Sequence, residues 1–181
     1  MDADARTAGW RVLAVEKRTW LWTFVAPADL EALWPLVLAV DTRSAAGWRR
    51  EAEHRLDGCS HHRPGHREAS AGVIALHTAS RTAVAAFLYA VHRDRDRLQI
   101  ERMRHLEFGA RPTTLAATLH LTLELAAHLR CREIALHTPR GDRGTLERGL
   151  HACALSCGFF ERRGLWLSRL PCTLDTGWTQ S

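Results

Sequence analysis

The run from Leu106 to Ala116 combines a tight turn with the start of a helix, an arrangement that can bind an anion. It ends an expected strand, Leu98 to Glu107, and it opens an expected helix from about Thr113 to Leu129. Pro112 suits the first helical position, where its missing N–H group costs nothing. The unpaired N–H groups and the partial positive charge of a helix N-terminus would face one point, which favours a phosphate.

Ionisable side chains on the strand before this turn could act as a general base. Glu101, His105 and Glu107 fall on one side of the expected strand by strict alternation. A base is needed where a neutral amine must be generated to attack a carbonyl. Glu101 and His105 are the candidates for such a base. The alternative is that these side chains are solvated or paired with the neighbouring Arg102 and Arg104.

Two groups of residues carry side chains that bind metals. His120, Glu124 and His128 recur every four residues along the expected helix, a spacing that can hold a metal. Leucines and alanines cover the rest of that helix, so the stripe is its face toward water, and the solvated interpretation is preferred. The second group lies in the polar segment of residues 57–70 and matches no known zinc module. Its members are Cys59, His61, His62 and His66. We predict no metal site.

Length and composition predict one folded domain. The chain has 181 residues, of which 46% are hydrophobic, and a formal net charge of +5. We expect a single domain over residues 1–181, with a core of about residues 18–170 and loose tails. The arginines are scattered among acidic residues, so the sequence does not favour nucleic-acid binding.

The cysteines and the apolar runs bear on the cellular compartment. The five cysteines are odd in number, and their spacings match no disulfide framework. The first residues are acidic and lack the basic and apolar regions of a signal peptide. The longest apolar run, Trp34 to Val40, contains a proline and is too short to cross a membrane. These features predict a reduced, cytoplasmic protein without a membrane contact.

Hydrophobic periodicity and turn residues predict an α/β chain. The expected strands are residues 19–25, 71–78, 82–92, 98–107, 132–137 and 165–170, with a short extra strand at 10–15. The expected helices are residues 30–38, 44–56, 113–129 and 145–157. Asp29 is expected to cap the first helix, and Gly158 is expected to end the last one. The predicted order is β-α-α-β-β-β-α-β-α-β.

The turn and this order resemble the GNAT acyltransferase superfamily, whose strand-to-helix turn binds the pyrophosphate of acyl-coenzyme A. The pattern of that turn is apolar-x-Pro-x-x-Arg/Gln-x-x-Gly-x-Gly/Ala. Leu106, Arg111 and Ala116 match its apolar, Arg/Gln and final positions, whereas Phe108 replaces the Pro and Thr114 the middle Gly. The resemblance covers about residues 18–170. It implies a mixed, mostly antiparallel sheet with helices on both faces.

The resemblance also implies a reaction. The protein would bind an acyl-coenzyme A, expected to be acetyl-coenzyme A, and transfer the acyl group to an amine of a small molecule or a protein. Glu101 or His105 would supply the base, because similar enzymes often draw one from this strand. The coenzyme-binding residues implied are Leu106, Phe108, Arg111, Pro112, Thr113, Thr114, Leu115 and Ala116. The acceptor, the acyl chain length and the oligomeric state, a homodimer included, are left open.

The last expected helix departs from the family in one position. GNAT proteins usually end this helix with Tyr-x-x-x-Gly-Phe, and the Tyr commonly protonates the departing thiolate. Gly158 and Phe159 are kept here, but Ala154 replaces the Tyr. Cys153 and Cys157 share the apolar face of the helix and are expected to be buried and inert. This alanine and Thr114 favour the alternative function, a non-catalytic GNAT-like binding or interaction module.

Overall fold

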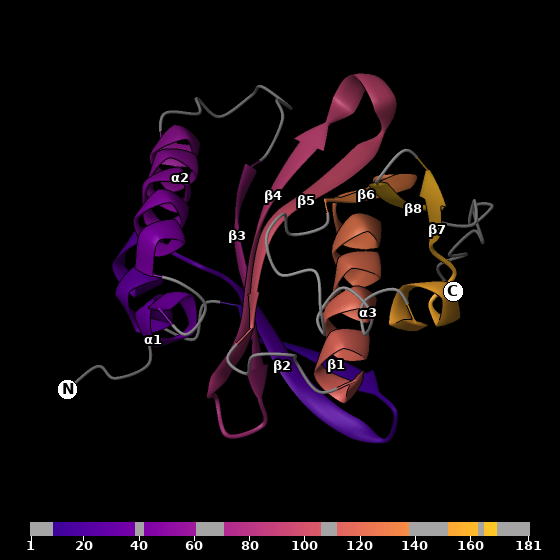
Figure 1. Cartoon of the computed structure of the whole chain (residues 1–181), viewed down its shortest axis with the longest axis horizontal. Helices are drawn as coiled ribbons and strands as arrows, with labels where there is room; N and C mark the ends of the chain where they lie inside the picture. Colours follow the sequence, from indigo (N-terminus) through magenta and orange to yellow (C-terminus); the bar gives the residue numbers. More distant parts are fainter. Residues whose placement is uncertain are drawn as a thin grey trace, which may run out of the picture.

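The computed structural model describes residues 9–38, 42–60, 71–105, 112–137, 152–162 and 165–169, and at positions 37, 38, 42–44, 58–60 and 105 it describes the backbone. Within these residues eight strands form one sheet in the order β1-β2-β3-β4-β5-β6-β8-β7. Helices α1 and α2 cover one face of the sheet and α3 covers the other (Figure 1).

The elements follow the predicted order. The strands are β1 (Arg11–Val15), β2 (Arg18–Phe24), β3 (Ala71–Thr78), β4 (Ala83–His92), β5 (Arg97–His105), β6 (Glu133–His137), β7 (Phe160–Arg162) and β8 (Leu165–Arg169). The helices are η1 (Pro27–Leu33), α1 (Trp34–Leu38), α2 (Thr42–Ser60), η2 (Arg93–Arg95) and α3 (Pro112–His128), and residues 152–156 are also helical. The sequence did not predict the short strand β7.

Neighbouring strands pair antiparallel except β5 and β6, which pair parallel. A parallel pair needs a crossover connection, and α3 provides it between these two strands. The predicted mixed, mostly antiparallel sheet is therefore confirmed.

The sheet separates two hydrophobic clusters. On the α3 side, leucines of the helix pack on residues such as Ile74, Phe87 and Ile100. On the α2 side, Trp48 packs with η1 and with residues such as Leu88. Adjacent residues of β4 thus face opposite clusters, which explains why this central strand is apolar on both faces.

The predicted N-cap of the first helix is wrong. Pro27 occupies the first turn of η1, and Ala26 precedes it in an extended conformation without a side-chain cap among the described residues. The N–H of Asp29 donates to the carbonyl of Ala26 at 2.9 Å, so Asp29 already lies inside the first turn. A proline with its fixed φ starts the helix earlier than the capping residue suggested.

Gly158 ends the helical segment of residues 152–156 as predicted. Its φ of +80° is in the left-handed region. The N–H of Gly158 donates to the carbonyl of Leu155 at 3.1 Å, and that of Phe159 donates to the carbonyl of Ala154 at 2.9 Å. These two bonds form a Schellman motif, which is completed by an apolar contact between the residues at its two ends. Ala154 and Phe159 are both buried in the α3-side cluster, so each belongs to this helix stop.

We expect Gly158→Ala to lower the free energy of unfolding by about 1–2 kcal/mol, because a Cβ is unfavourable in the left-handed region. A Cβ at Gly158 would meet no atom within 4 Å, so the cost is conformational rather than steric. Gly47→Ala is the matched control, since Gly47 lies in α2 and has equally open surroundings. It should stabilise the protein by about 0.5–1 kcal/mol. Urea denaturation of both variants measures their unfolding free energies. Equal changes in the two variants would contradict the role of Gly158 as a left-handed helix stop.

Candidate functional site

Strands β5 and β6 stop pairing halfway along β5. Their register runs from Arg97 opposite Glu133 to Ile100 opposite Leu136. β5 then continues to His105, while β6 ends at His137. Among the described residues, β5 beyond Ile100 has no pairing with β6, and we call this stretch the opening. The helix that follows β5 begins at Pro112, as predicted.

The first turn of α3 has the properties of an anion site. Its leading N–H groups lack acceptors within the helix, and the turn contains no acidic side chain. Thr113 and Thr114 are partly exposed there, whereas Leu115 and Ala116 are buried. The hydroxyl of Thr118 donates to the carbonyl of Thr114 at 2.8 Å, which ties the first turn to the second. The predicted binding residues Leu106, Phe108 and Arg111 lie outside the described residues.

A β-bulge interrupts β5 at the point where it leaves β6. Glu101 lies opposite Leu88 and Arg104 opposite Ala86, so β5 has one extra residue there. Arg102 takes a φ of +47°, a conformation that non-glycine residues rarely adopt. Its carbonyl accepts a 2.8 Å hydrogen bond from the indole Nε1 of Trp48, whose side chain is buried. Helix α2 therefore holds the bulge in place.

The bulge breaks the alternation on which the shared side of Glu101 and His105 was predicted. Glu101 is in register with Leu88, whose side chain lies in the α2-side cluster. Position 105 is in register with Ala85, which belongs to the α3-side cluster. The side chain of His105 is not among those described, so its catalytic role stays a prediction.

Glu101 is held by two hydrogen-bond donors on the α2 side of the sheet. Arg55 Nη2 donates to Glu101 Oε2 at 2.6 Å, and Gln99 Nε2 donates to Glu101 Oε1. Arg55 also donates to the carbonyl of Tyr89 at 2.9 Å and pairs with Glu51 at 3.0 Å. Glu101 is thus paired, but with Arg55 on α2 and not with the neighbouring Arg102 and Arg104 named in the alternative.

These contacts favour the ionised form of Glu101. Burial raises the pKa of this carboxyl group, but the hydrogen bond from Gln99 and the charge and hydrogen bond of Arg55 outweigh it, so its pKa is lowered. Glu101 is therefore a carboxylate at neutral pH. A carboxylate with a low pKa is a weak base. It can orient a cationic or polar group, and it can accept a proton from a strongly acidic intermediate.

The helical segment 152–156 lies beside the start of α3. The Sγ atom of Cys153 is 3.7 Å from the carbonyl oxygen of Pro112. Burial raises the pKa of the Cys153 and Cys157 thiols, which agrees with the prediction that they are inert, although both are half-buried rather than fully buried. Ala154, at the position of the family's Tyr, is 0% exposed. A tyrosine ring would not fit there without displacing the surrounding core.

The chain contains a single tyrosine, Tyr89, and it lies away from the opening. It is in register with Ile100, where β5 and β6 are still paired, and it is 5% exposed. Its ring packs over Gly72, where an added Cβ would come within 2.9 Å of the phenolic oxygen. Tyr89 therefore has a packing role and does not replace the missing helix tyrosine.

The metal candidates gain no support from the described residues, in which no three His, Cys, Asp or Glu side chains gather at a metal-binding distance. His120, Glu124 and His128 are exposed along α3, and the rings of Trp22 and Phe24 lie near that of His128. Arg11 Nη1 lies 2.9 Å from the Nδ1 atom of His128. His61, His62 and His66 and the side chain of Cys59 lie outside the described part. No helix described here is long and apolar enough to cross a membrane.

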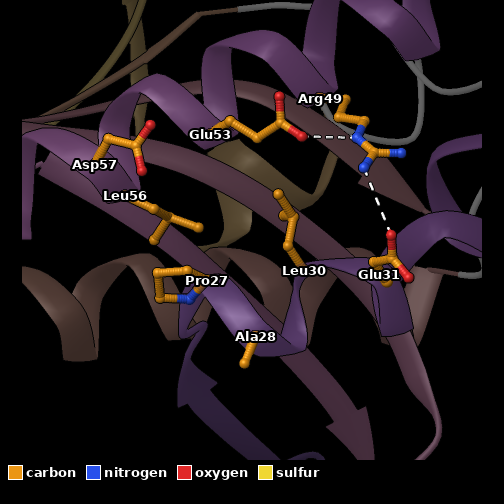
Figure 2. Close-up of a pocket in the computed structure, with 8 residues that line it drawn as sticks. All are labelled: Pro27, Ala28, Leu30, Glu31, Arg49, Glu53, Leu56 and Asp57. Atoms are coloured by element: carbon orange, nitrogen blue, oxygen red, sulfur yellow. Dashed lines mark hydrogen bonds and ion pairs between the residues drawn. The ribbon is translucent and has the colours of Figure 1, made fainter.

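A cavity of about 430 Å³ lies between η1 and α2 (Figure 2). Arg49 pairs there with Glu53 at 2.7 Å and with Glu31 at 3.5 Å, and Asp57 lies at the other end. By helical spacing, the cavity borders one flank of α2, and Arg55 projects from the other flank. We therefore do not include this cavity in the candidate site.

Trp48→Phe tests whether α2 holds the bulge. Phenylalanine keeps an aromatic ring at position 48, but the carbonyl of Arg102 loses its hydrogen-bond donor. We therefore expect a loss of about 1–3 kcal/mol in unfolding free energy. Trp34→Phe is the control, because the indole of Trp34 is half-buried and stacks on the guanidinium of Arg49 instead. Amide hydrogen exchange of residues 101–104 should accelerate in Trp48→Phe. Unchanged exchange would contradict the role given to Trp48.

Comparison with solved structures places this arrangement in a known fold. An N-acetyltransferase from Thermoplasma acidophilum in complex with coenzyme A aligns with a TM-score of 0.55 at 10% identity, over 83% of this chain and 99% of the other. The ribosomal-protein-S18-alanine N-acetyltransferase of Escherichia coli aligns with a TM-score of 0.57 at 11% identity, over 88% and 99%. A spermidine N-acetyltransferase chimera from Vibrio cholerae and hSSAT aligns with a TM-score of 0.59 at 12% identity, over 83% of this chain and 95% of the other.

Structural similarity at such low sequence identity shows the fold of this chain. The chain has the GNAT fold, and the resemblance drawn from its turn and element order is confirmed at that level. The sequence matches no protein-family model and no curated protein.

Proposed function

We propose that this protein is an acyl-coenzyme A-dependent N-acyltransferase that transfers an acetyl group to an amine. One observation carries the proposal: β5 and β6 separate after Ile100, and α3 begins at Pro112 beside that opening. An extended thioester can enter between the strands while its phosphates meet the N-terminus of the helix. The coenzyme A complex of the Thermoplasma acidophilum protein, which has the same fold, supports this choice of ligand.

The coenzyme would be bound mainly through backbone groups. The pyrophosphate would accept hydrogen bonds from the first N–H groups of α3, from Thr113 to Ala116, and from the threonine hydroxyls. Arg111 would add a positive charge next to that turn, and Leu106 and Phe108 would contact the ligand from the strand end. The positive partial charge of α3 and the lack of an acidic residue in its first turn favour this anion.

The proposed reaction is the attack of a neutral amine nitrogen on the thioester carbonyl. A C–N bond forms, the carbonyl oxygen becomes an oxyanion, and the C–S bond then breaks to release the coenzyme A thiolate. Backbone N–H groups of β5 beyond Ile100, freed from β6, would stabilise the oxyanion. Alignment of the two reactants in the opening would supply much of the rate acceleration.

Glu101 and His105 are the proposed groups for proton removal. The amine nitrogen becomes strongly acidic once it has added to the carbonyl, so even a weakly basic carboxylate can take its proton, directly or through a water molecule. The lowered pKa of Glu101 keeps it in the required ionised form throughout the neutral range. Release of the thiolate does not require a general acid, because the pKa of a thiol is only moderately above 7.

A second candidate function is favoured by Ala154. This residue is buried within the helix stop, so no side chain can reach the sulfur from the position that the family usually uses. A protein with this geometry could bind acyl-coenzyme A as an interaction module and release no thiol.

Two measurements on the purified protein separate these functions. Calorimetric titration with acetyl-coenzyme A tests binding, and a thiol-trapping dye detects transfer to a panel of amines. The panel should include a polyamine and a peptide with N-terminal alanine, because proteins of this fold are named for such acceptors. Thiol release that depends on an amine supports the enzyme. Binding without release for every amine supports the module, and absence of binding contradicts both.

A further inference from the structure

A second cavity, of about 570 Å³, lies over β2 and β3 on the face that carries η1. Strand β4 separates these strands from β5, so the cavity is distinct from the opening beside β6. Its volume is within the range of small-molecule sites. Four alanines, Ala26, Ala28, Ala32 and Ala75, contribute to its lining and leave the space between η1 and the sheet unfilled.

The walls of this cavity are apolar and aromatic. Thr23 and His77 line it from strands β2 and β3, and Leu33 lines it from η1. Phe24 ends β2, and Val25 follows it. Trp10 precedes β1 and meets the ring of His77 edge-on, with 4.7 Å between ring centroids. A flat ring could therefore enter between aromatic and alanine side chains.

His77 is a buried polar residue in the lining of the cavity. It is 8% exposed, and its Nδ1 atom is sealed from solvent without a hydrogen-bond partner among the described residues. Burial lowers the pKa of His77, and the backbone of Ala75 opposes this in part, so the imidazole is neutral. His77 lines the cavity, and because its Nδ1 is buried, Nε2 is the ring nitrogen assigned to a ligand.

The charged residues stay at the edge of the cavity. Asp29 and Arg81 line it but are exposed, and the guanidinium of Arg81 stacks on the outer part of the site, 5.5 Å from the Trp10 ring centroid. The inner polar groups, on Thr23 and His77, are uncharged, and the Thr23 hydroxyl already donates to the carbonyl of Phe24 at 3.0 Å. An ion placed inside would lose its hydration without meeting an opposite buried charge.

We propose that this cavity is a binding site for a small, flat, uncharged aromatic molecule with one N–H or O–H donor, such as an indole or a phenol. The ring of the ligand packs beside Trp10 against the alanines, and its donor bonds the imidazole of His77. This site goes beyond the proposed acyl transfer, shares no described residue with the anion site at α3, and does not depend on that function.

The test is a titration of the isotope-labelled full chain with indole, followed by the NMR signals of the Trp10 indole and the His77 ring. N-methylindole is the matched probe, because it keeps the ring and lacks the donor. We expect saturable binding of indole at least about tenfold tighter than that of N-methylindole, a difference of about 1.4 kcal/mol. His77→Leu should remove this preference.

Ala32→Phe fills the cavity from an exposed position of η1, so the fold should be retained. It should weaken indole binding at least about tenfold. Ala46→Phe, at an exposed position of α2 that does not line the cavity, is the control and should bind as wild type does. Absence of saturable binding, or equal affinities of the two phenylalanine variants, would overturn the site. A preference for indole that survives His77→Leu would overturn the role of His77.

Discussion

Thr113→Glu should raise the stability of the free protein and weaken its binding of acetyl-coenzyme A by at least about tenfold. Thr113 lies in the first turn of α3, where a carboxylate interacts favourably with the helix dipole and adds about 0.3–1 kcal/mol. The same carboxylate repels the phosphates expected at that turn. Two charges about 4 Å apart near a protein surface interact by up to about 4 kcal/mol. Binding and stability should therefore change in opposite directions.

Thr113→Gln is the matched control, because it has nearly the same shape and no charge. We expect it to bind acetyl-coenzyme A within about threefold of wild type, which corresponds to less than 1 kcal/mol. Calorimetry measures the affinities, and thermal unfolding without ligand measures the stabilities. Equal affinities of the Glu and Gln variants would place the phosphates away from this helix.

Arg55→Met should cost about 2–4 kcal/mol of unfolding free energy at neutral pH. Methionine keeps much of the buried stem, but Glu101 and the carbonyl of Tyr89 lose a charged donor. Removal of one partner from a buried ion pair typically costs about 3–5 kcal/mol, and the 26% exposure of the Glu101 side chain reduces this value. At this chain length the midpoint of thermal unfolding should fall by roughly 2–4 °C per kcal/mol.

The effect of Arg55→Met should depend on pH. The pKa of Glu101 is lower in the folded protein than in the unfolded chain, so its contribution is present above the unfolded pKa and is lost as the pH falls through the folded pKa. The difference between wild type and Arg55→Met should therefore shrink below about pH 4.

Arg49→Met is the control on the same helix. Arg49 pairs with Glu53 at 2.7 Å, but its side chain is 43% exposed, so its replacement should cost much less than that of Arg55. Urea denaturation of both variants at pH 7 and pH 3.5 measures the differences. An Arg55→Met effect that is constant with pH would show that Arg55 contributes packing rather than a charge contact with Glu101.

Local signals in the sequence were sufficient for much of the fold. Pro112 marked the start of α3, and Gly158 marked a helix stop, because proline and glycine restrict or permit backbone angles that other residues do not. The alternation in β2 and the two-sided apolar pattern of β4 gave the strands. At the helix N-terminus before α1, Pro27 and Asp29 gave competing signals, and the proline determined the start.

The bulge at Arg102 could not be predicted. Nothing about an arginine indicates a positive φ, since the conformation is imposed by the pairing with β4 and by the hydrogen bond from Trp48. The bulge is the reason that the predicted shared side of Glu101 and His105 was wrong. One extra residue reverses the side of the sheet on which every later side chain of the strand lies.

The partner of Glu101 was equally hidden from the sequence. Arg55 is 46 residues away, and it reaches β5 because α2 packs along the sheet. Nearby arginines at 102 and 104 were plausible partners by sequence distance, but contacts between elements depend on the tertiary arrangement. For Ala154, the sequence showed the missing hydroxyl group, and the structure adds that this position is fully buried within the helix stop.

The most direct test of the proposed acyl-coenzyme A site is an amide NMR map of the isotope-labelled protein during titration with acetyl-coenzyme A. We expect saturable shifts in two places that are distant in sequence: residues 113–116 at the start of α3 and residues 101–104 at the bulge of β5. Shifts at both places would locate the phosphates at the helix and the thioester in the opening. Absence of saturable shifts at millimolar ligand, or shifts confined to other surfaces, would contradict the account.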